Sequence, residues 1–347
     1  MAVDSKPSNL PNREDTEMAN ILVAGKIHQA GIDILRNAAG FNVQLVSEVS
    51  VESYSPYLPD ADALLIRTQP LTKREINTAS NLRIVSRHGV GYDSVDVDAL
   101  TARNIPLTIV GDVNSLSVAE HTLALLLALA KRVSYFDRSI HEGKWERRNS
   151  FSAVEVAGRT LFILGFGRIG KEVARMAKSF HMQVIVYDPF LPDDVFTEHQ
   201  VKRIIDISSG LQQADAVTVH LPLSGDKPLI GEAELALMKR SAMLINTARG
   251  GIVDEKALAV ALQNNALGGA ALDVLQDEPP DLQDTLFAQT DRLILSPHSA
   301  GLTEEAAMRM SVSAATNIIN YFHGQLDNEL VVNKQVLVLN DLMSQLP

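Results

Sequence analysis

Short apolar runs alternate with longer segments of mixed polarity along most of the chain. Runs of this length, bounded by turn-forming residues, are typical of buried strands in parallel sheets. The runs that we predict as strands cover residues 21–24, 43–46, 63–66, 83–85, 106–107, 161–164, 184–187, 216–219, 243–246, 270–272 and 293–295. Because helix-like segments separate these runs, the pattern predicts an α/β protein whose parallel sheets are covered by helices.

Two helix starts are marked by a hydroxyl residue followed three positions later by Glu. Thr72 precedes Glu75 in this way, and Ser117 precedes Glu120. In such a capping box the hydroxyl binds a backbone N–H of the first turn, and the carboxylate reaches back to the cap residue. We therefore predict one helix after Thr72 and a long apolar helix over residues 118–138.

The most informative motif directly follows the predicted strand over residues 161–164. Gly165, Gly167 and Gly170 form the pattern G-x-G-x-x-G, a helical segment follows, and the next apolar run ends in Asp188. The first glycine permits a tight turn, the second lets the backbone approach a pyrophosphate, and the third lets the helix pack on the strand. Free N–H groups at the helix start bind phosphate. The motif predicts dinucleotide binding.

Asp188 discriminates between the two nicotinamide dinucleotides. It lies at the distance from the glycine motif where an acid binds the ribose hydroxyls of NAD. A carboxylate there repels the 2′-phosphate of NADP, which an Arg would attract. Residues 186–190 contain no Arg or Lys. We therefore predict NAD as the cofactor.

The glycine motif lies far along the chain, although a dinucleotide fold usually begins with it. The preceding strands therefore need a domain of their own, to which a final helix over residues 303–322 could return. We predict a substrate-binding outer domain made of residues 20–115 and 302–347, and between these parts an NAD-binding Rossmann domain, residues 116–301. Both are expected to be doubly wound parallel sheets, Rossmann-like or flavodoxin-like, with the active site in a cleft between them.

Composition narrows the class of protein. A chain of 347 residues with 46% hydrophobic residues is long enough for two cores, and the polar residues 1–19 are predicted to be a disordered tail. The net charge of −11 argues against nucleic acid or an anionic membrane as a partner. Cysteine is absent, which excludes disulfides and a Cys-ligated metal, and we predict no metal site. Apolar runs stay far below the roughly 18 residues that a membrane span needs. Since cysteine is absent, a cytoplasmic protein is the simplest expectation.

Three loops, each following a predicted strand, carry residues suited to hydride transfer between a nicotinamide and a carbonyl. Arg249, in N-T-A-R-G-G, can present its guanidinium to a carboxylate in bidentate fashion. His298, in S-P-H-S-A-G, can donate a proton to the developing alkoxide. Glu278 lies in the loop that begins at Asp273 and precedes two prolines, which hold the backbone extended. His121, inside the long apolar helix, is predicted to be a packing residue instead.

These motifs resemble those of the D-isomer-specific 2-hydroxyacid dehydrogenases, the family that includes phosphoglycerate dehydrogenase. The resemblance covers about residues 20–333 and includes the motifs N-x-x-S-V-A-E and D-V-x-x-x-E-P. It implies that Arg249, Glu278 and His298 are the catalytic residues. The residues predicted to contact NAD are Asn114, Gly165, Gly167, Arg168, Ile169, Gly170, Asp188, His220, Pro222, Thr247, Asp273, Ser299, Ala300 and Gly301.

The resemblance also implies a reaction, the interconversion of small 2-hydroxy acids and 2-oxo acids with NAD. Arg249 would hold the substrate carboxylate and polarise the carbonyl. His298 would protonate the emerging alkoxide, and Glu278 would fix the imidazole tautomer and stabilise its cation.

Substrate choice depends on a second group of residues, in the predicted outer domain. The predicted substrate residues are Arg67, Arg87, His88, Gly89 and Val90. Related positions in phosphoglycerate dehydrogenases hold a phosphate, so we predict a substrate with a distal anionic group. His88 departs from the small residue that is usual at its position. The alternative is that Arg67 and Arg87 pair with acids such as Asp93.

Other functions remain open on this fold. An NAD-sensing corepressor would keep the same fold and the same catalytic residues, and phosphite dehydrogenase shares the fold. Formate dehydrogenases typically have Gln where Glu278 stands, which argues against that activity.

Oligomeric state follows from the resemblance as well. The apolar helix over residues 118–138 and the segment 141–145 build a two-fold dimer in the resembled family, so we predict a homodimer. The chain ends at Pro347, so we do not expect the C-terminal regulatory domain of the long phosphoglycerate dehydrogenases.

Overall fold

The structure is a computed structural model that describes residues 18–223, 225, 227–281 and 291–337. The chain divides into two compact units. The terminal unit contains Met1–Val113 and Ala307–Pro347, and the central unit contains Asn114–Ala306. The sequence predicts boundaries at 115/116 and 301/302, so the central unit takes in a few more residues at each end.

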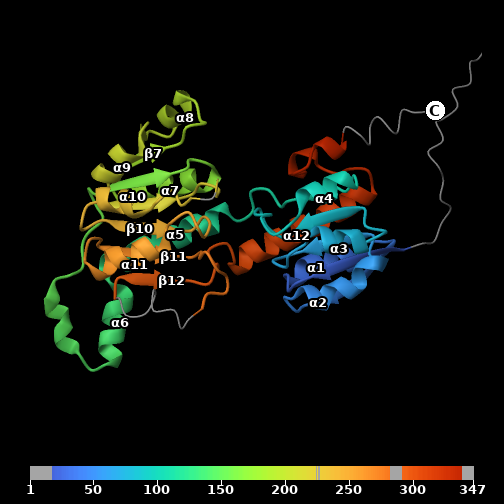
Figure 1. The fold of residues 1–347 in the computed structure, drawn as a ribbon, viewed down its shortest axis with the longest axis horizontal. Coiled ribbons are helices and arrows are strands. Elements are labelled where there is room, and N and C mark those ends of the chain that lie inside the picture. Colours follow the sequence, from blue (N-terminus) through green and yellow to red (C-terminus); the bar gives the residue numbers. More distant parts are fainter. Residues whose placement is uncertain (1–17, 224, 226, 282–290, 338–347) are drawn as a thin grey trace, which may run out of the picture. The chain divides into compact units, whose positions relative to one another are not determined.

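The terminal unit is a five-stranded parallel sheet with helices packed against it (Figure 1). Its strands are β1 (Ala19–Ala24), β2 (Phe41–Val46), β3 (Ala63–Ile66), β4 (Ile84–Arg87) and β5 (Leu107–Thr108), in the order β2-β1-β3-β4-β5. Its helices are α1 (Gln29–Asn37), α2 (Val51–Tyr54), η1 (Ser55–Asp60), α3 (Lys73–Thr78), α4 (Val97–Ala102), most of α12 (Glu304–Phe322) and η3 (Asn328–Leu330). This strand order is flavodoxin-like. Most of the predicted tail, residues 1–17, lies outside the described residues.

The central unit is a seven-stranded parallel sheet (Figure 1). Its strands are β6 (Thr160–Leu164), β7 (Gln183–Tyr187), β8 (Lys202–Arg203), β9 (Ala216–Val219), β10 (Met243–Asn246), β11 (Gly269–Leu272) and β12 (Leu293–Leu295). Its helices are α5 (Ser115–Lys131), α6 (Val133–His141), η2 (Trp145–Ser150), α7 (Arg168–Ser179), α8 (Asp193–Glu198), α9 (Ile207–Gln213), α10 (Glu232–Leu237) and α11 (Glu255–Gln263). The order β12-β11-β10-β9-β6-β7-β8 reverses direction at β6, as in a Rossmann fold.

Both faces of the central sheet are buried, which explains why its strands are apolar at consecutive positions. Phe162 and Leu164 belong to a core that includes residues of α9, α10 and α11. Leu161 and Ile163 belong to a second core, which includes residues of α5, α7 and α8. Each fully buried side chain of this size contributes roughly 1.5–3 kcal/mol to folding. Helices on both faces confirm the doubly wound α/β fold.

The two predicted helix starts have different outcomes. Thr72 and Glu75 form the predicted capping box at the start of α3. The box predicted at Ser117 is wrong, because α5 begins earlier, with Asn114 as its N-cap. The Ser117 hydroxyl lies 3.0 Å from that of Thr303 instead. The S-x-x-E pattern alone cannot exclude such an alternative partner.

The long helix predicted over residues 118–138 consists of two helices. Arg132 has a φ of +53°, which ends α5 and precedes α6. The sequence signal is missing because left-handed residues at helix ends are usually Gly or Asn, not Arg. Strand β8 was not predicted, since its two residues are the polar Lys202 and Arg203. Among the described residues, no helix combines the length and the apolar character needed to cross a membrane.

Candidate active site

The three predicted catalytic residues lie at one edge of the central sheet. Arg249 follows β10, Glu278 lies in the segment after β11, and His298 follows β12. These strands are parallel neighbours, so their carboxyl ends meet at the same edge. Open α/β sheets bind their ligands at this edge.

Backbone packing brings the Arg249 and Glu278 loops into direct contact. A Cβ added to Gly250 would lie 1.9 Å from the carbonyl oxygen of Leu275, which is closer than any side chain allows. Glu278 is tied to the same segment, because its Oε1 accepts a hydrogen bond from the Leu275 N–H at 3.0 Å. The glycine after Arg249 therefore permits one loop to lie against the other.

Glu278 and His298 form a hydrogen-bonded pair. The distance between Glu278 Oε2 and His298 Nδ1 is 2.8 Å. Because a carboxylate only accepts hydrogen bonds, Nδ1 carries a proton, and Nε2 is the nitrogen that can gain or lose one. The imidazole is 52% exposed, so a small molecule can reach it. This arrangement suits a general acid or base.

His298 has a left-handed backbone that its surroundings hold in place. Its φ is +49°, a conformation that is uncommon outside Gly, Asn and Asp. Asp273 is 1% exposed, and its two carboxylate oxygens accept hydrogen bonds from the N–H groups of Ser299 and Ala300, both at 2.9 Å. The Asp273 carbonyl accepts from the His298 N–H at 2.7 Å. Charge-assisted hydrogen bonds of this kind stabilise the turn that presents the imidazole.

The Arg249 loop is organised by Asn246, which is buried at the end of β10. Asn246 Oδ1 accepts from the Ala248 N–H at 3.0 Å, and Nδ2 donates to the Arg249 carbonyl at 2.9 Å. The Thr247 hydroxyl lies 3.0 Å from that of Thr122 in α5. Arg249 Nη1 donates to the Ala248 carbonyl at 2.7 Å. The loop therefore positions a guanidinium, a group that binds carboxylates in bidentate geometry.

The glycine motif forms a tight turn between β6 and α7. Gly165 has a φ of +94°, and a Cβ added to Gly170 would lie 2.2 Å from the Gly165 carbonyl oxygen. Gly167, which has no side chain to cap the helix, is the N-cap of α7. A Cβ added to Gly167 would meet no atom of the described residues within 4 Å. The helix N-terminus therefore faces open space, which fits the pyrophosphate of a dinucleotide.

Asp188 lies beside this turn, directly after β7. Its carboxylate accepts hydrogen bonds from the Phe166 N–H at 2.9 Å and from the Phe190 N–H at 3.0 Å. Since Phe166 lies between the first two glycines of the motif, the acid is tied to the glycine turn. The turn itself follows β6, where the strand order reverses and where such sheets bind dinucleotides. The position of the carboxylate fits the ribose hydroxyls of NAD.

The remaining predicted cofactor residues also follow strands of the central sheet or begin its helices. They are Asn114 before α5, Arg168 and Ile169 in α7, His220 and Pro222 after β9, and Gly301 after β12. His220 Nε2 lies 3.0 Å from the Thr218 hydroxyl, and burial lowers the pKa of the imidazole to about 3. His220 is therefore a neutral group at physiological pH. Asn114 packs against Gly301, where an added Cβ would lie 2.9 Å from Asn114 Nδ2.

The predicted substrate residues belong to the terminal unit, where Arg67 follows β3, Arg87 ends β4 and residues 88–90 follow it; β3 and β4 are neighbouring strands. Arg67 Nη1 donates to a backbone carbonyl at 3.2 Å, and burial lowers the pKa of its guanidinium. Arg87 Nη1 donates to the His88 carbonyl at 2.7 Å and covers Gly89, where an added Cβ would lie 3.2 Å away. Val90 is half-buried in the same loop. Both arginines are therefore at one edge of the terminal sheet.

The imidazole of His88 is buried inside the terminal unit. It is 4% exposed, and its Nε2 lies 2.9 Å from the hydroxyl of Ser311 in α12. Burial and the positive charges of Arg67 and Arg87 lower the pKa of His88 to about 4. The side chain thus ties the loop after β4 to α12. A contact between this side chain and a substrate stays a prediction that the burial does not favour.

We expect His88→Gln to weaken the pH dependence of stability. Native His88 stays neutral down to its pKa of about 4, whereas the unfolded chain takes up a proton near the ordinary value of 6.5. As pH falls from 7.5 to 5, this difference should lower the free energy of unfolding of the wild type by about 2 kcal/mol. The His88→Gln variant should not show this decrease. Urea unfolding at both pH values measures the difference. Equal pH dependence of the two proteins would contradict the prediction.

Comparison with known proteins identifies the family. Residues 123–300 match the model of the D-isomer specific 2-hydroxyacid dehydrogenase, NAD binding domain. The chain is 36% identical, over 316 residues, to D-3-phosphoglycerate dehydrogenase of Methanocaldococcus jannaschii, with 90% of this chain and 59% of that protein aligned. The chain belongs to the D-isomer specific 2-hydroxyacid dehydrogenase family. It spans about three fifths of the length of the Methanocaldococcus enzyme.

Two further proteins that are similar to this chain extend the comparison. The chain is 40% identical over 258 residues to (S)-sulfolactate dehydrogenase of Chromohalobacter salexigens, covering 74% of this chain and 83% of that protein. D-lactate dehydrogenase from Aquifex aeolicus, solved with NAD and lactic acid, superposes with a TM-score of 0.80 at 25% identity. That match covers 90% of this chain and 99% of the other.

Two residues near the site of this family member were not predicted. The Ser296 hydroxyl donates to Asp273 Oδ1 at 2.6 Å, and His121 Nε2 lies 3.0 Å from the Ser296 oxygen. His121 lies in α5 and is mostly buried, with 27% of its side chain exposed, but its ring also contacts the turn before His298, which was not predicted. The available signal was a polar ring inside an otherwise apolar helix.

Proposed function

We propose that the protein is an NAD-dependent dehydrogenase of small D-2-hydroxy acids, which also reduces the corresponding 2-oxo acids. The observation that carries the proposal is the 2.8 Å contact between Glu278 and His298, next to the Arg249 loop. Carbonyl reduction requires a cation, a proton donor and a carboxylate that orients the donor, and Arg249, His298 and Glu278 can supply them. The match to the family's NAD-binding domain supports the cofactor. A cytoplasmic location stays a prediction from composition.

The chain's own residues divide the chemistry among them. Arg249 binds the substrate carboxylate and polarises the neighbouring carbonyl. The hydride comes from NADH when it is bound. His298, as an imidazolium, donates its Nε2 proton to the developing alkoxide, and the neutral ring accepts that proton in the oxidative direction. Because Glu278 keeps Nδ1 protonated, the ring exchanges its proton at Nε2 alone.

Arg67 and Arg87 favour substrates that carry a second anionic group. Guanidinium groups bind phosphate and sulfonate oxygens through charge-assisted hydrogen bonds. Two of the related enzymes are named for substrates with such a group, 3-phosphoglycerate and sulfolactate. We therefore propose a 2-oxo acid with a distal phosphate or sulfonate as the preferred substrate class.

A panel of 2-oxo acids tests the proposed function. Oxidation of NADH is followed at 340 nm with glyoxylate, hydroxypyruvate, 3-phosphohydroxypyruvate and 3-sulfopyruvate. We expect turnover on the panel and a higher kcat/KM for the two substrates with a distal anion. Turnover without that preference would contradict the role of Arg67 and Arg87. An inactive protein that still binds NADH would contradict the dehydrogenase assignment and favour an NAD-sensing role.

Gly167→Val tests the cofactor site without disturbing the fold. Gly167 has φ −71° and ψ −161°, which valine adopts readily, and the added side chain would enter the open space in front of α7. We expect the Kd for NADH to rise about 10- to 100-fold, or roughly 1.4–2.7 kcal/mol. Titration of the intrinsic or cofactor fluorescence measures the change.

Gly231→Val is the matched control for this substitution. Gly231 is also a helix N-cap with extended backbone, φ −103° and ψ −163°, and a Cβ there would lie 3.4 Å from Glu234 Oε2. Both variants change the cap of a helix in the same way. If both bound NADH equally well, the glycine turn would not be the pyrophosphate site.

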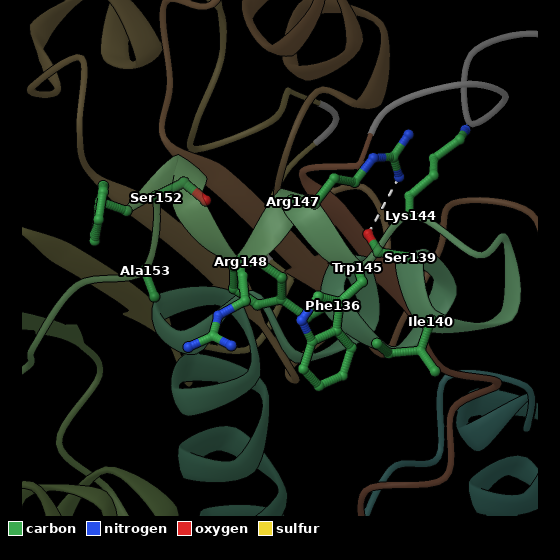
Figure 2. Close-up of a pocket in the computed structure, with 10 residues that line it drawn as sticks. Phe136, Ser139, Ile140, Lys144, Trp145, Arg147, Arg148, Ser152 and Ala153 are labelled. Atoms are coloured by element: carbon green, nitrogen blue, oxygen red, sulfur yellow. Dashed lines mark hydrogen bonds between the residues drawn. The ribbon is translucent and has the colours of Figure 1, made fainter.

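We propose that two copies of the chain associate through the segment of α6 and η2. A hollow of about 700 Å³ lies there. Phe136, Ile140 and Trp145 are among the residues that line it (Figure 2). Trp145 is 66% exposed, and Phe151, which also lines the hollow, is 89% exposed. Apolar surfaces of this kind mark interaction sites in soluble proteins. This segment overlaps residues 118–138 and 141–145, the region that builds a two-fold dimer in the resembled family.

Light scattering tests the homodimer. We expect twice the chain mass of 37.8 kDa for the wild type, and a shift toward monomer for Trp145→Ser. Val260→Ser, at a 55% exposed position on α11, is the control and should remain dimeric. A monomeric wild type at micromolar concentration would rule this association out.

A further inference from the structure

A chain of hydrogen bonds runs from α5 to the turn that presents His298. His121 Nε2 in α5 lies 3.0 Å from Ser296 Oγ, and Ser296 Oγ lies 2.6 Å from Asp273 Oδ1. His121 Nε2 is itself 3.5 Å from the same carboxylate oxygen. All members of this chain belong to the central unit. Helix, strand end and loop are thereby joined through side chains.

The protons in this chain can be assigned from donor and acceptor chemistry. A carboxylate only accepts, so the short contact requires that Ser296 directs its single hydroxyl proton to Asp273. The Ser296 oxygen must then accept from His121, so Nε2 of His121 carries a proton. The order of donation is therefore His121 to Ser296 to Asp273.

The last member of the chain fixes the geometry around His298. Asp273 accepts hydrogen bonds from the N–H groups of Ser299 and Ala300, and its carbonyl accepts from His298. Since His298 has a φ of +49°, this turn needs such restraints to keep its conformation. A change in the orientation of the Asp273 carboxylate would move the imidazole relative to its substrate.

We propose that His121 is a positioning residue, which acts through Ser296 on the Asp273 carboxylate and so holds the turn that presents His298. The inference rests on the proposed function of His298 as proton donor. It assigns to α5 a part in the reaction, which the sequence does not predict for His121. Supporting partners of this kind typically affect activity 10- to 100-fold when removed.

Kinetics of His121 variants test the role. We expect His121→Leu to lower kcat about 10-fold with KM nearly unchanged, because a misplaced proton donor slows the chemical step. His121→Gln, whose amide N–H can occupy the Nε2 position, should recover most of the loss. His323→Leu changes an exposed histidine after α12 and should behave as wild type. Wild-type kcat in His121→Leu, or failure of Gln to rescue, would overturn the proposal.

A double-mutant cycle tests the route through Ser296. Ser296→Ala should lower kcat to a similar extent as His121→Leu, and the double variant should be no slower than either single variant, because both break the same chain. Multiplicative losses would mean that the two residues act independently, which would overturn the proposal.

Hydrogen exchange tests the proposal without any substrate. The amide protons of Ser299 and Ala300 should exchange faster in His121→Leu than in the wild type, and should keep wild-type rates in His121→Gln. Unchanged exchange in His121→Leu would overturn the positioning role. If the exchange rates changed but the wild type were inactive on all four 2-oxo acids, the hydrogen-bond chain would stand and the proposed function would fail.

Discussion

Replacing His298 with Ala is expected to lower kcat about 10²- to 10⁴-fold while leaving the Kd for NADH nearly unchanged. The imidazole, which is 52% exposed and hydrogen-bonded through Nδ1, is the group whose Nε2 can protonate an alkoxide. It is the turn after β6, not His298, that we propose to bind the pyrophosphate. Single-turnover kinetics with saturating NADH and substrate measure the loss in the chemical step.

Glu278→Gln tests whether the charge of Glu278, or only its hydrogen bond to His298, matters for turnover. Glutamine can still accept the hydrogen bond from Nδ1 through its carbonyl oxygen, but it does not stabilise the imidazolium. We expect a kcat between those of the wild type and His298→Ala. His323→Ala, at an exposed histidine outside the central unit, is the control. Wild-type turnover in His298→Ala would contradict the role of His298 as the proton donor.

Arg249→Ala is expected to lower kcat/KM about 1,000-fold, or roughly 4 kcal/mol, through both a higher KM and a lower kcat. The guanidinium is proposed to bind the substrate carboxylate before and during the reaction, so both parameters should change. Arg249→Lys keeps the charge without the planar pair of donors and should recover only part of the loss. Steady-state kinetics on the best 2-oxo acid of the panel measure both effects.

Arg175→Lys is the control for Arg249. Arg175 is exposed on α7 and paired with Glu172 at 2.7 Å, so the conservative change there should leave kcat/KM at the wild-type value. Addition of guanidinium chloride to Arg249→Ala should restore some activity if the loss is that of a carboxylate-binding cation. An Arg249→Lys variant with wild-type kcat/KM would contradict bidentate binding.

Local patterns were sufficient to predict the apolar strands and the glycine turn, but not the polar strand β8. Apolar runs such as 216–219 and 243–246 match their strands because both faces of the central sheet are buried, so that most consecutive positions along each strand are apolar. The role of Gly170 is equally local, since it concerns the contact of one helix with the turn that precedes it. These features depend on residues close together in the sequence.

Contacts between distant segments could not be predicted in the same way. Nothing in the order of residues indicates that His121 meets Ser296, because this contact depends on how α5 packs beside β10 and β11. The break between α5 and α6 at Arg132 was not predicted either. The left-handed backbone of this single residue leaves the apolar pattern of the helix unchanged, so the pattern gives no sign of it. The predicted pairing of Glu278 with His298 had its source in the resemblance.

The reactive side chains Arg249, Glu278 and His298 all follow strands of the central unit, whereas Arg67 and Arg87 belong to the terminal unit. On the roles proposed for these residues, mutations that alter recognition of a distal anion can therefore accumulate around Arg67 and Arg87 without disturbing the proposed proton-transfer pair. Chimaeras that join the terminal segments of one relative to the central segment of another offer a direct route to new acid preferences with inherited redox chemistry.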